Sequence, residues 1–196
     1  MSKPSRATPE ARRLDLIAAT ARVLASHGAG GASVRTIATE AGVSPGLVTH
    51  HFGGVARLVE ATYDHVAAQV AQALEAAVAR AGDDPRARLA AYVEASFAPP
   101  IADAALLATW IAFWSMARAD AAMAASHARH YAGYRARLEA LLAACGVAPA
   151  RCRLAAVGVA ALVDGLWLEL CLSSGTFDAA EARALTGDYL AMLVAG

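Results

Sequence analysis

Apolar residues recur every three or four positions along most of the chain, a spacing that predicts helices rather than strands. In the first segment, the apolar stripe consists of Leu14, Ile17, Ala18, Ala21 and Leu24. Thr8 is a favoured capping residue, Pro9 suits the first turn, and Gly28 suits the end of a helix. We therefore expect a first helix over about residues 9–28.

Two very short helical segments follow. Ser33 is the expected cap of a helix over 34–41, which Gly42 ends. Ser44 and Pro45 begin a third helix that ends near His51. The longer segments cover about residues 55–81, 84–98, 103–118, 120–145, 150–173 and 179–194. The pattern thus predicts an all-α fold of about nine helices.

Composition agrees with this fold and argues against a membrane span. Of the 196 residues 58% are hydrophobic and only 6% aromatic, so residues that favour strands are scarce. The longest apolar run, 154–163, ends at Asp164, well short of the ~20 residues that a spanning helix needs. The basic N-terminus leads into no apolar signal core, so we expect a cytoplasmic protein. Cys145, Cys152 and Cys171 lack metal or redox spacing, which predicts free thiols.

Charge is unevenly distributed, although the net charge is zero. Residues 1–60 carry seven Lys and Arg against four Asp and Glu, and residues 61–196 carry ten against thirteen. A basic N-terminal part suits a nucleic-acid partner, although surface charge also varies this much without one. We expect an N-terminal DNA-binding domain over 1–54, with a helix-turn-helix at about 33–52, and a helical ligand-binding and dimerisation domain over 55–196.

The two short helices, joined by a tight turn and braced by a longer helix, have the arrangement of a helix-turn-helix. In that motif the second short helix enters the major groove of DNA. Gly42 allows the turn, and we expect Val43 and Leu47 to pack the short helices against Leu24 and Ile37. The alternative is a plain helical hairpin without a role in DNA binding.

The segment IATEAGVSPGLVTHHF resembles the DNA-binding head of the TetR family of bacterial repressors, and the likeness covers about residues 9–65. Two positions depart from the family pattern. Thr49 stands where a tyrosine is usual, and Val55-Ala56 stand where Lys-Glu is usual. The missing lysine implies either that Arg57 replaces its phosphate contact or that affinity for the DNA backbone is lower.

The resemblance also implies which residues touch DNA. They are Ser33, Arg35, Thr36, Ser44, Pro45, Gly46, Leu47, Thr49, His50 and His51. Arg35 is the best candidate for a base contact, because a guanidinium bonds both O6 and N7 of guanine. Thr49 offers a hydroxyl and a methyl group to thymine. Ser33, Ser44 and His51 are expected to contact phosphate, and for His51 a neutral residue at a helix end is an equal alternative.

The rest of the chain places aromatic and acidic residues on two apolar helices. The helical period brings together Asp103, Leu107, Trp110, Phe113, Trp114 and Ala117 on the segment 103–118. On the segment 150–173, Asp164, Trp167 and Cys171 share a face, and Asp164 and Glu169 interrupt apolar sequence. Because a buried acid needs a partner, these acids predict either a wet helix edge or a cationic ligand.

The strings TWIAFW and AALVDGLWL resemble the C-terminal domain of BetI-type repressors of the TetR family, which govern glycine-betaine synthesis and respond to choline. Aromatic faces beside a carboxylate suit a quaternary ammonium ion, which has no N–H groups to donate. The candidate ligand-binding residues are Trp110, Phe113, Trp114, Asp164 and Trp167. Two alternatives remain, that the aromatic stripe is ordinary core and that the pocket binds an apolar or aromatic ligand.

An enzyme is the remaining class to weigh. His127 and His130 lie three residues apart near Tyr131 and Tyr134, but no third metal ligand, phosphate-binding loop or nucleophile motif accompanies them. We therefore expect no catalytic site, metal or cofactor. The prediction is a homodimeric repressor that a small molecule releases from a pseudo-palindromic operator, with the dimer contact on the last two helices as the resemblance implies. The main alternative is a helical ligand-binding protein without DNA activity.

Overall fold

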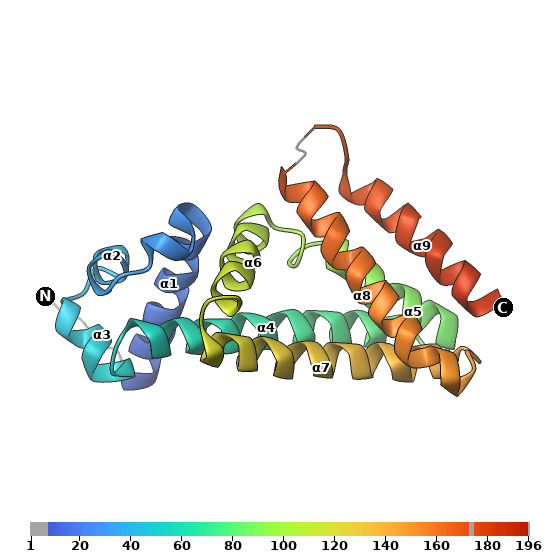
Figure 1. Cartoon of the computed structure of the whole chain (residues 1–196), viewed down its shortest axis with the longest axis horizontal. Coiled ribbons are helices and arrows are strands. Elements are labelled where there is room, and N and C mark those ends of the chain that lie inside the picture. Colours follow the sequence, from blue (N-terminus) through green and yellow to red (C-terminus); the bar gives the residue numbers. More distant parts are fainter. Residues whose placement is uncertain (1–7, 173–174, 196) are drawn as a thin grey trace, which may run out of the picture. The chain divides into compact units, whose positions relative to one another are not determined.

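The computed structural model describes residues 8–172 and 175–195, and within these ranges every regular element is a helix, as expected (Figure 1). The helices are α1 (Pro9–Gly31), α2 (Val34–Glu40), α3 (Pro45–Phe52), α4 (Val55–Arg80), α5 (Pro85–Glu94), the 3-10 helix η1 (Ala95–Phe97), α6 (Ala104–Ala117), α7 (Ala121–Ala144), α8 (Pro149–Leu172) and α9 (Ala179–Ala195). The predicted all-α fold and the order of its helices are confirmed.

The helix ends follow from capping chemistry. The Thr8 side chain accepts a hydrogen bond from the Ala11 amide, and Pro9 occupies the first turn of α1. Gly28, the predicted end of this helix, has a φ of 64° and kinks α1, which resumes for one more short turn. In the C-terminal two thirds of the chain, Asp side chains accept bonds from amides in the first turns of their helices. These caps are Asp84, Asp103, Asp120 and Asp178, at the starts of α5, α6, α7 and α9.

The chain forms two compact units. The N-terminal unit contains the described residues up to Val66 together with Ala108–Ser126, and the C-terminal unit contains Ala67–Leu107 and the described chain from His127 onward. The helices α4, α6 and α7 each contribute residues to both units. The predicted boundary between the DNA-binding and ligand-binding domains, between residues 54 and 55, falls immediately before α4. This boundary stays a prediction.

In the N-terminal unit, α2 and α3 lie beside α1 (Figure 1). Their apolar faces meet the start of α4 in one core, formed by Leu16, Ile17, Val23, Ile37, Ala38, Val48, Phe52 and Leu58. An ion pair between Arg22 and Glu40, with a nitrogen–oxygen distance of 2.6 Å, ties α1 to the end of α2. The unit therefore holds the two short helices by apolar packing with a polar link at the rim.

In the C-terminal unit, α7 runs beside α4, and Arg137 donates two hydrogen bonds to Glu75 at 2.7 and 2.8 Å (Figure 1). The helices α8 and α9 lie side by side. Each of these two helices forms a hydrogen bond with η1. From α8, the Trp167 indole donates to the Ser96 carbonyl at 3.0 Å, and from α9, Arg183 donates to the Phe97 carbonyl at 2.8 Å. Buried residues of this unit include Leu74, Leu89, Phe97, Leu138, Leu142, Val159 and Ala182.

Helix α8 is long and apolar enough to cross a membrane by length and composition, with a mean hydropathy of 1.8 over its most apolar stretch. This is weak evidence, because a core helix of a soluble protein passes the same test. Along α8, one face is buried within the chain. The opposite face is an exposed stripe formed by Leu154, Val157, Ala161, Gly165, Leu168 and Leu172. We call these residues the α8 stripe.

Candidate functional site

The turn between α2 and α3 has the geometry that the sequence predicts. Gly42 has a φ of 64°, in the left-handed region that glycine adopts without strain. The Gly42 amide donates to the Thr39 carbonyl at 3.1 Å, and the Val43 amide donates to the Ala38 carbonyl at 2.9 Å. These two bonds end α2 in a Schellman motif and redirect the chain into α3. The helix-turn-helix is therefore present at residues 33–52.

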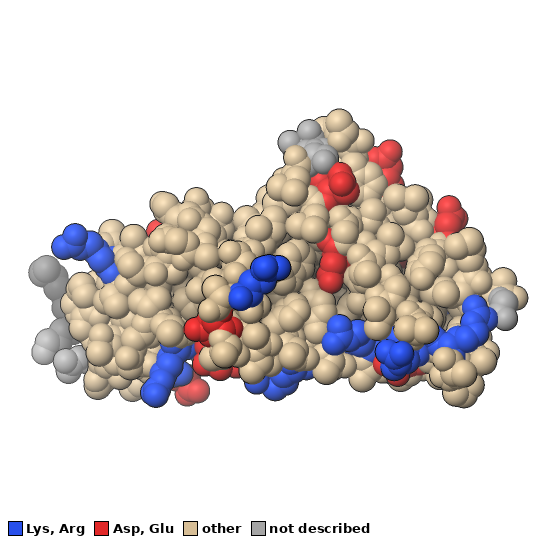
Figure 2. All heavy atoms as spheres, viewed as in Figure 1, with Lys and Arg blue, Asp and Glu red and all other residues tan. Residues whose placement is uncertain are grey.

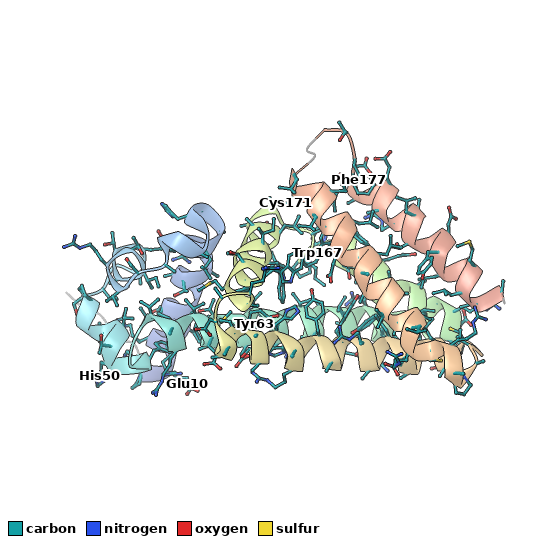
Figure 3. The ribbon with its side chains drawn as sticks, in the orientation of Figure 1. Glu10, His50, Tyr63, Trp167, Cys171 and Phe177 are labelled. Atoms are coloured by element: carbon teal, nitrogen blue, oxygen red, sulfur yellow. The ribbon has the colours of Figure 1, made fainter. Side chains whose placement is uncertain are left out.

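Helix α3 has one buried face and one exposed face. Val48 and Phe52 lie in the core, at 0% and 6% exposure, whereas Gly46, Thr49 and His50 are exposed (Figure 3 labels His50). Of the two residues expected to pack against Leu24 and Ile37, Val43 packs on the core that contains Ile37, whereas Leu47 is half-buried and its contact remains a prediction. Because α3 begins at Pro45, the helical period turns Val48 inward and leaves Leu47 half-buried. The exposed face is the one available to the DNA groove.

The other residues of the predicted DNA interface divide into two groups. Arg35, Ser44 and Pro45 are exposed, and Ser44 precedes α3 without forming a side-chain cap. Ser33 and Thr36 instead form a capping box for α2, in which each side chain bonds the other residue's backbone amide. The Thr36 hydroxyl also donates to the Gly31 carbonyl at 2.6 Å. Both hydroxyls therefore serve the fold, and their contact with DNA remains a prediction.

His51 lies half-buried at the end of α3, beside several cationic neighbours. Loss of solvation lowers the pKa of His51, and the positive charges of His50, Arg13 and Arg12 lower this pKa further. A lowered pKa favours the neutral imidazole, which is the form that the alternative interpretation of His51 requires. A neutral ring can still donate one hydrogen bond to a phosphate oxygen.

A second group of candidate residues surrounds Asp164 in the C-terminal unit. The carboxyl group of Asp164 on α8 is half-buried and accepts a hydrogen bond from the Tyr131 hydroxyl of α7 at 3.0 Å. Burial raises the pKa of Asp164 to about 6, although the Tyr131 bond and the charge of Arg135 oppose the shift. The guanidinium of Arg135 lies 5.9 Å from the centre of the Tyr131 ring. Asp164 is thus an acid whose pKa lies well above the ordinary value of a carboxyl group.

Aromatic side chains gather around this acid. The Tyr134 and Tyr92 rings are stacked with centroids 5.7 Å apart, and the Tyr131 and Tyr134 centroids are 6.4 Å apart. Within the described part of the chain, the buried Tyr134 hydroxyl has no hydrogen bond of normal geometry, although the Ser96 side chain approaches it. Burial and nearby Tyr92 and Asp164 raise the pKa of Tyr134. We call Tyr92, Tyr131, Tyr134 and Asp164 the tyrosine–acid cluster.

Trp167 lies three residues after Asp164 on α8 (Figure 3). Its indole is 7% exposed, and its bond to the Ser96 carbonyl uses the one N–H group that the ring has. The Ser96 side chain also approaches Tyr134, so Trp167 and the tyrosine–acid cluster share a neighbour. The structure therefore brings two predicted ligand residues, Asp164 and Trp167, to one region of the C-terminal unit.

The other predicted ligand residues, Trp110, Phe113 and Trp114, belong to the N-terminal unit, as does Tyr63 of α4, which Figure 3 labels. The Trp110 and Tyr63 rings meet edge to face with centroids 5.3 Å apart, and the Phe113 and Tyr63 centroids are 4.7 Å apart. Trp110 and Phe113 are buried, whereas Trp114 is half-buried. These contacts fit the alternative that the stripe belongs to the core, and a ligand role for the three residues remains a prediction.

Tyr92, Tyr131 and Tyr134 are not among the ligand residues that the sequence predicts. In the sequence, Tyr131 and Tyr134 stand out only as neighbours of His127 and His130. Their three-residue spacing places both on one face of α7, which was the available signal. Their contact with an acid on α8 is a long-range feature that helical periodicity does not encode.

The remaining titratable residues of interest are the histidines of α7 and the three cysteines. In the ranges 8–172 and 175–195, no group of three or more His, Cys, Asp or Glu side chains is arranged to hold a metal ion. The His127 ring lies against Tyr131 with centroids 4.1 Å apart, and burial and Arg135 lower the pKa of His127. The thiols of Cys145, Cys152 and Cys171 are free.

Comparison with known proteins matches both halves of the chain. Residues 16–62 match the model of bacterial regulatory proteins of the tetR family, and residues 85–195 match that of the BetI-type transcriptional repressor C-terminal domain. The HTH-type transcriptional regulator BetI of Burkholderia thailandensis is 38% identical over 190 residues, which cover 95% of each chain. These relatives are regulators of transcription and not enzymes.

Solved structures agree with this assignment. A crystal structure from Pseudomonas aeruginosa PAO1, assigned as a transcriptional regulator, is 40% identical with a TM-score of 0.88, and the match covers 98% of this chain and 94% of that one. A protein from Saccharomonospora viridis, solved in complex with choline, shares the fold at 18% identity with a TM-score of 0.77, covering 94% and 97% of the two chains. The chain belongs to the TetR family of bacterial regulators, as a ligand-responsive, DNA-binding transcriptional repressor of the BetI type.

Proposed function

We propose that the protein works in the cytoplasm as a homodimer that binds a pseudo-palindromic operator and leaves it when a small organic cation, such as choline, binds near Asp164. The observation that carries this proposal is the hydrogen-bonded, half-buried acid among tyrosine rings in the C-terminal unit. The proposal has three parts, which concern the DNA, the dimer and the effector.

The DNA part rests on the exposed face of α3. Gly46, Thr49 and His50 are spaced so that they point the same way, and a helix with this face fits the major groove. Arg35 on α2 and Arg57 on α4 are exposed cations of the same unit. The Arg57 guanidinium passes near Gly53, at the end of α3. Arg57 is thus a suitable replacement for the phosphate contact of the lysine that is absent at Val55.

Fluorescence anisotropy with the DNA upstream of the gene tests this part. The protein should prefer that DNA over random duplex, and each phosphate contact should add about −0.9 to the slope of log affinity against log salt. Equal affinity for both duplexes at low salt would support the alternative of a ligand-binding protein without DNA activity.

The dimer part rests on the α8 stripe. Leu154 is 63% exposed, Leu168 is 37% exposed and Leu172 is 74% exposed, and α9 adds Leu185 and Met192 at 50% and 67%. Figure 2 shows that the visible surface over α8 and α9 is mostly uncharged, with a few charged side chains. An exposed apolar face of this kind suits an interface between copies of the chain. Two copies related by a two-fold axis would place two recognition helices about 34–36 Å apart.

The effector part rests on the chemistry of the tyrosine–acid cluster. A quaternary ammonium ion donates no N–H bonds, so it is held by negative charge and by the electron-rich faces of aromatic rings. Asp164 supplies the charge, and Tyr92, Tyr131 and Tyr134 supply rings. The choline complex of the Saccharomonospora viridis protein lends support from a distant relative of the same fold.

Tryptophan fluorescence tests the effector in the free protein. Choline should change the emission saturably, whereas its neutral carbon isostere, 3,3-dimethylbutanol, should not, because it keeps the shape and lacks the charge. Asp164→Asn should weaken choline binding strongly, and Glu169→Gln, which removes an exposed acid from the same helix, should not. Equal binding of the isostere would instead favour an apolar or aromatic effector.

A further inference from the structure

Arg13, which lies in the second turn of α1, makes two contacts with the end of the recognition helix. Its guanidinium donates a hydrogen bond to the His51 carbonyl and lies over the Phe52 ring, 4.2 Å from the ring centre. His51 and Phe52 are the last two residues of α3. We propose that Arg13 is a positioning residue for DNA recognition, which fixes the C-terminal turn of α3 through these two contacts.

Helix α3 needs such support because it is very short. It has eight residues, about two turns, and helices of this length are unstable alone. The carbonyls of its last turn lack partners within the helix, and they carry the negative end of the helix dipole. The Gly53 amide satisfies the Thr49 carbonyl at 2.8 Å, and Arg13 supplies a cationic donor for the carbonyl of His51.

The apolar contact acts at the same place. Phe52 is 6% exposed and belongs to the core of the N-terminal unit, so its ring fixes the rotation of α3 on that core. Arg13 covers the outer face of this ring, where a guanidinium gains a cation–π attraction. Thr49 and His50, which point toward the groove, lie in the same turn. Loosening this turn therefore moves the residues that read the bases.

Arg13 is exposed, so a direct contact with DNA phosphate is the competing role. The two roles differ in their salt dependence. Loss of a phosphate contact reduces the slope of log affinity against log salt by about 0.9, whereas loss of a positioning contact leaves the number of neutralised phosphates unchanged. They also differ in the free protein, where only a positioning role affects the order of α3.

The experiment compares Arg13→Met and Arg13→Lys with Arg12→Met in the full-length protein. Arg12 is the adjacent cation on α1, and it pairs with Asp15 at 3.6 Å instead of with α3. Arg13→Met should lower affinity for the upstream DNA about tenfold, the size expected when a contact of ~1.4 kcal/mol is lost, with an unchanged salt slope. Exchange of the Gly53 amide should accelerate by a similar factor in the absence of DNA. Arg12→Met should change neither the operator preference nor this exchange.

Two results with Arg13→Met would overturn the positioning role. One is a salt slope reduced by about 0.9, and the other is unchanged DNA affinity together with unchanged amide exchange. If the Met variant does not fold, Arg13→Lys decides, because it keeps the charge but lacks the planar guanidinium that covers the Phe52 ring. Faster exchange of the Gly53 amide without DNA, with an unchanged salt slope, supports positioning, and unchanged exchange overturns it. The inference rests on the proposed DNA binding, yet amide exchange tests it even if the wild-type protein fails to bind the upstream DNA.

Discussion

Asp164 is the residue on which the proposed sensing of an organic cation rests. Its carboxyl group is half-buried, and the Tyr131 hydroxyl orients it by a bond of 3.0 Å. Burial raises its pKa to about 6, so the group is mostly charged at neutral pH but is protonated easily. A cation that enters this site stabilises the charged form and displaces the remaining protons.

The raised pKa predicts that affinity for choline depends on pH. Below about pH 6, Asp164 is neutral in the free protein, and affinity should fall by up to tenfold for each further pH unit. Above that pH, the carboxylate is already charged and affinity should level off. The groups that act on it from α7 are Tyr131, which donates its hydrogen bond, and Arg135, whose charge opposes the shift. Fluorescence titrations across this range measure the effect, and a flat profile in the wild-type protein would exclude Asp164 as the cation's partner.

A second prediction at the residue scale concerns Arg35. Its exposed guanidinium on α2 is expected to bond a guanine, a contact that contributes about 1–3 kcal/mol of discrimination. Arg35→Ala should therefore flatten the preference at one position of each operator half-site. Arg118→Ala is the matched control, because Arg118 is an exposed arginine of the same unit that lies outside the helix-turn-helix. A uniform loss of affinity on all sequences would make Arg35 a phosphate contact instead.

At the scale of elements, the sequence predicted most boundaries because their chemistry is local. Thr8, Ser33 and Gly42 each act on residues within one turn, and each ends or begins a helix as expected. Burial was harder to predict, since the residue of α3 that faces the core depends on where α3 starts. Because α3 starts at Pro45, Val48 and not Leu47 is fully buried. The Tyr131–Asp164 contact joins residues 33 positions apart and could not be read from periodicity.

A prediction at the scale of elements concerns the dimer interface on helix α8. Gly165 lies within the α8 stripe, and a side chain added there meets no atom of the same chain within 4 Å. If the stripe is the dimer interface, Gly165→Arg should place a charge between the two copies and produce monomers. Gly133→Arg is the control, because Gly133 is an exposed glycine on α7 with equally open surroundings. Sedimentation velocity measures the result, and a stable Gly165→Arg dimer would place the interface elsewhere.

At the scale of the whole molecule, the protein must couple its DNA and effector sites. A ligand shifts a conformational equilibrium only as far as it binds one state more tightly than the other. For a BetI-type repressor with a cationic effector, the DNA-binding state must therefore have the lower affinity for choline. By reciprocity, operator DNA should weaken choline binding by the same factor by which choline weakens operator binding.

Release of DNA by choline is the measurement that tests this function most directly. The wild-type dimer is bound to labelled upstream DNA at a fixed salt concentration and titrated with choline or with 3,3-dimethylbutanol. We expect choline to release the DNA saturably, the neutral isostere to leave it bound, and Asp164→Asn to hold DNA normally while failing to respond. DNA that stays bound at saturating choline, or release by choline that is unchanged in Asp164→Asn, would contradict a cation sensor centred on Asp164.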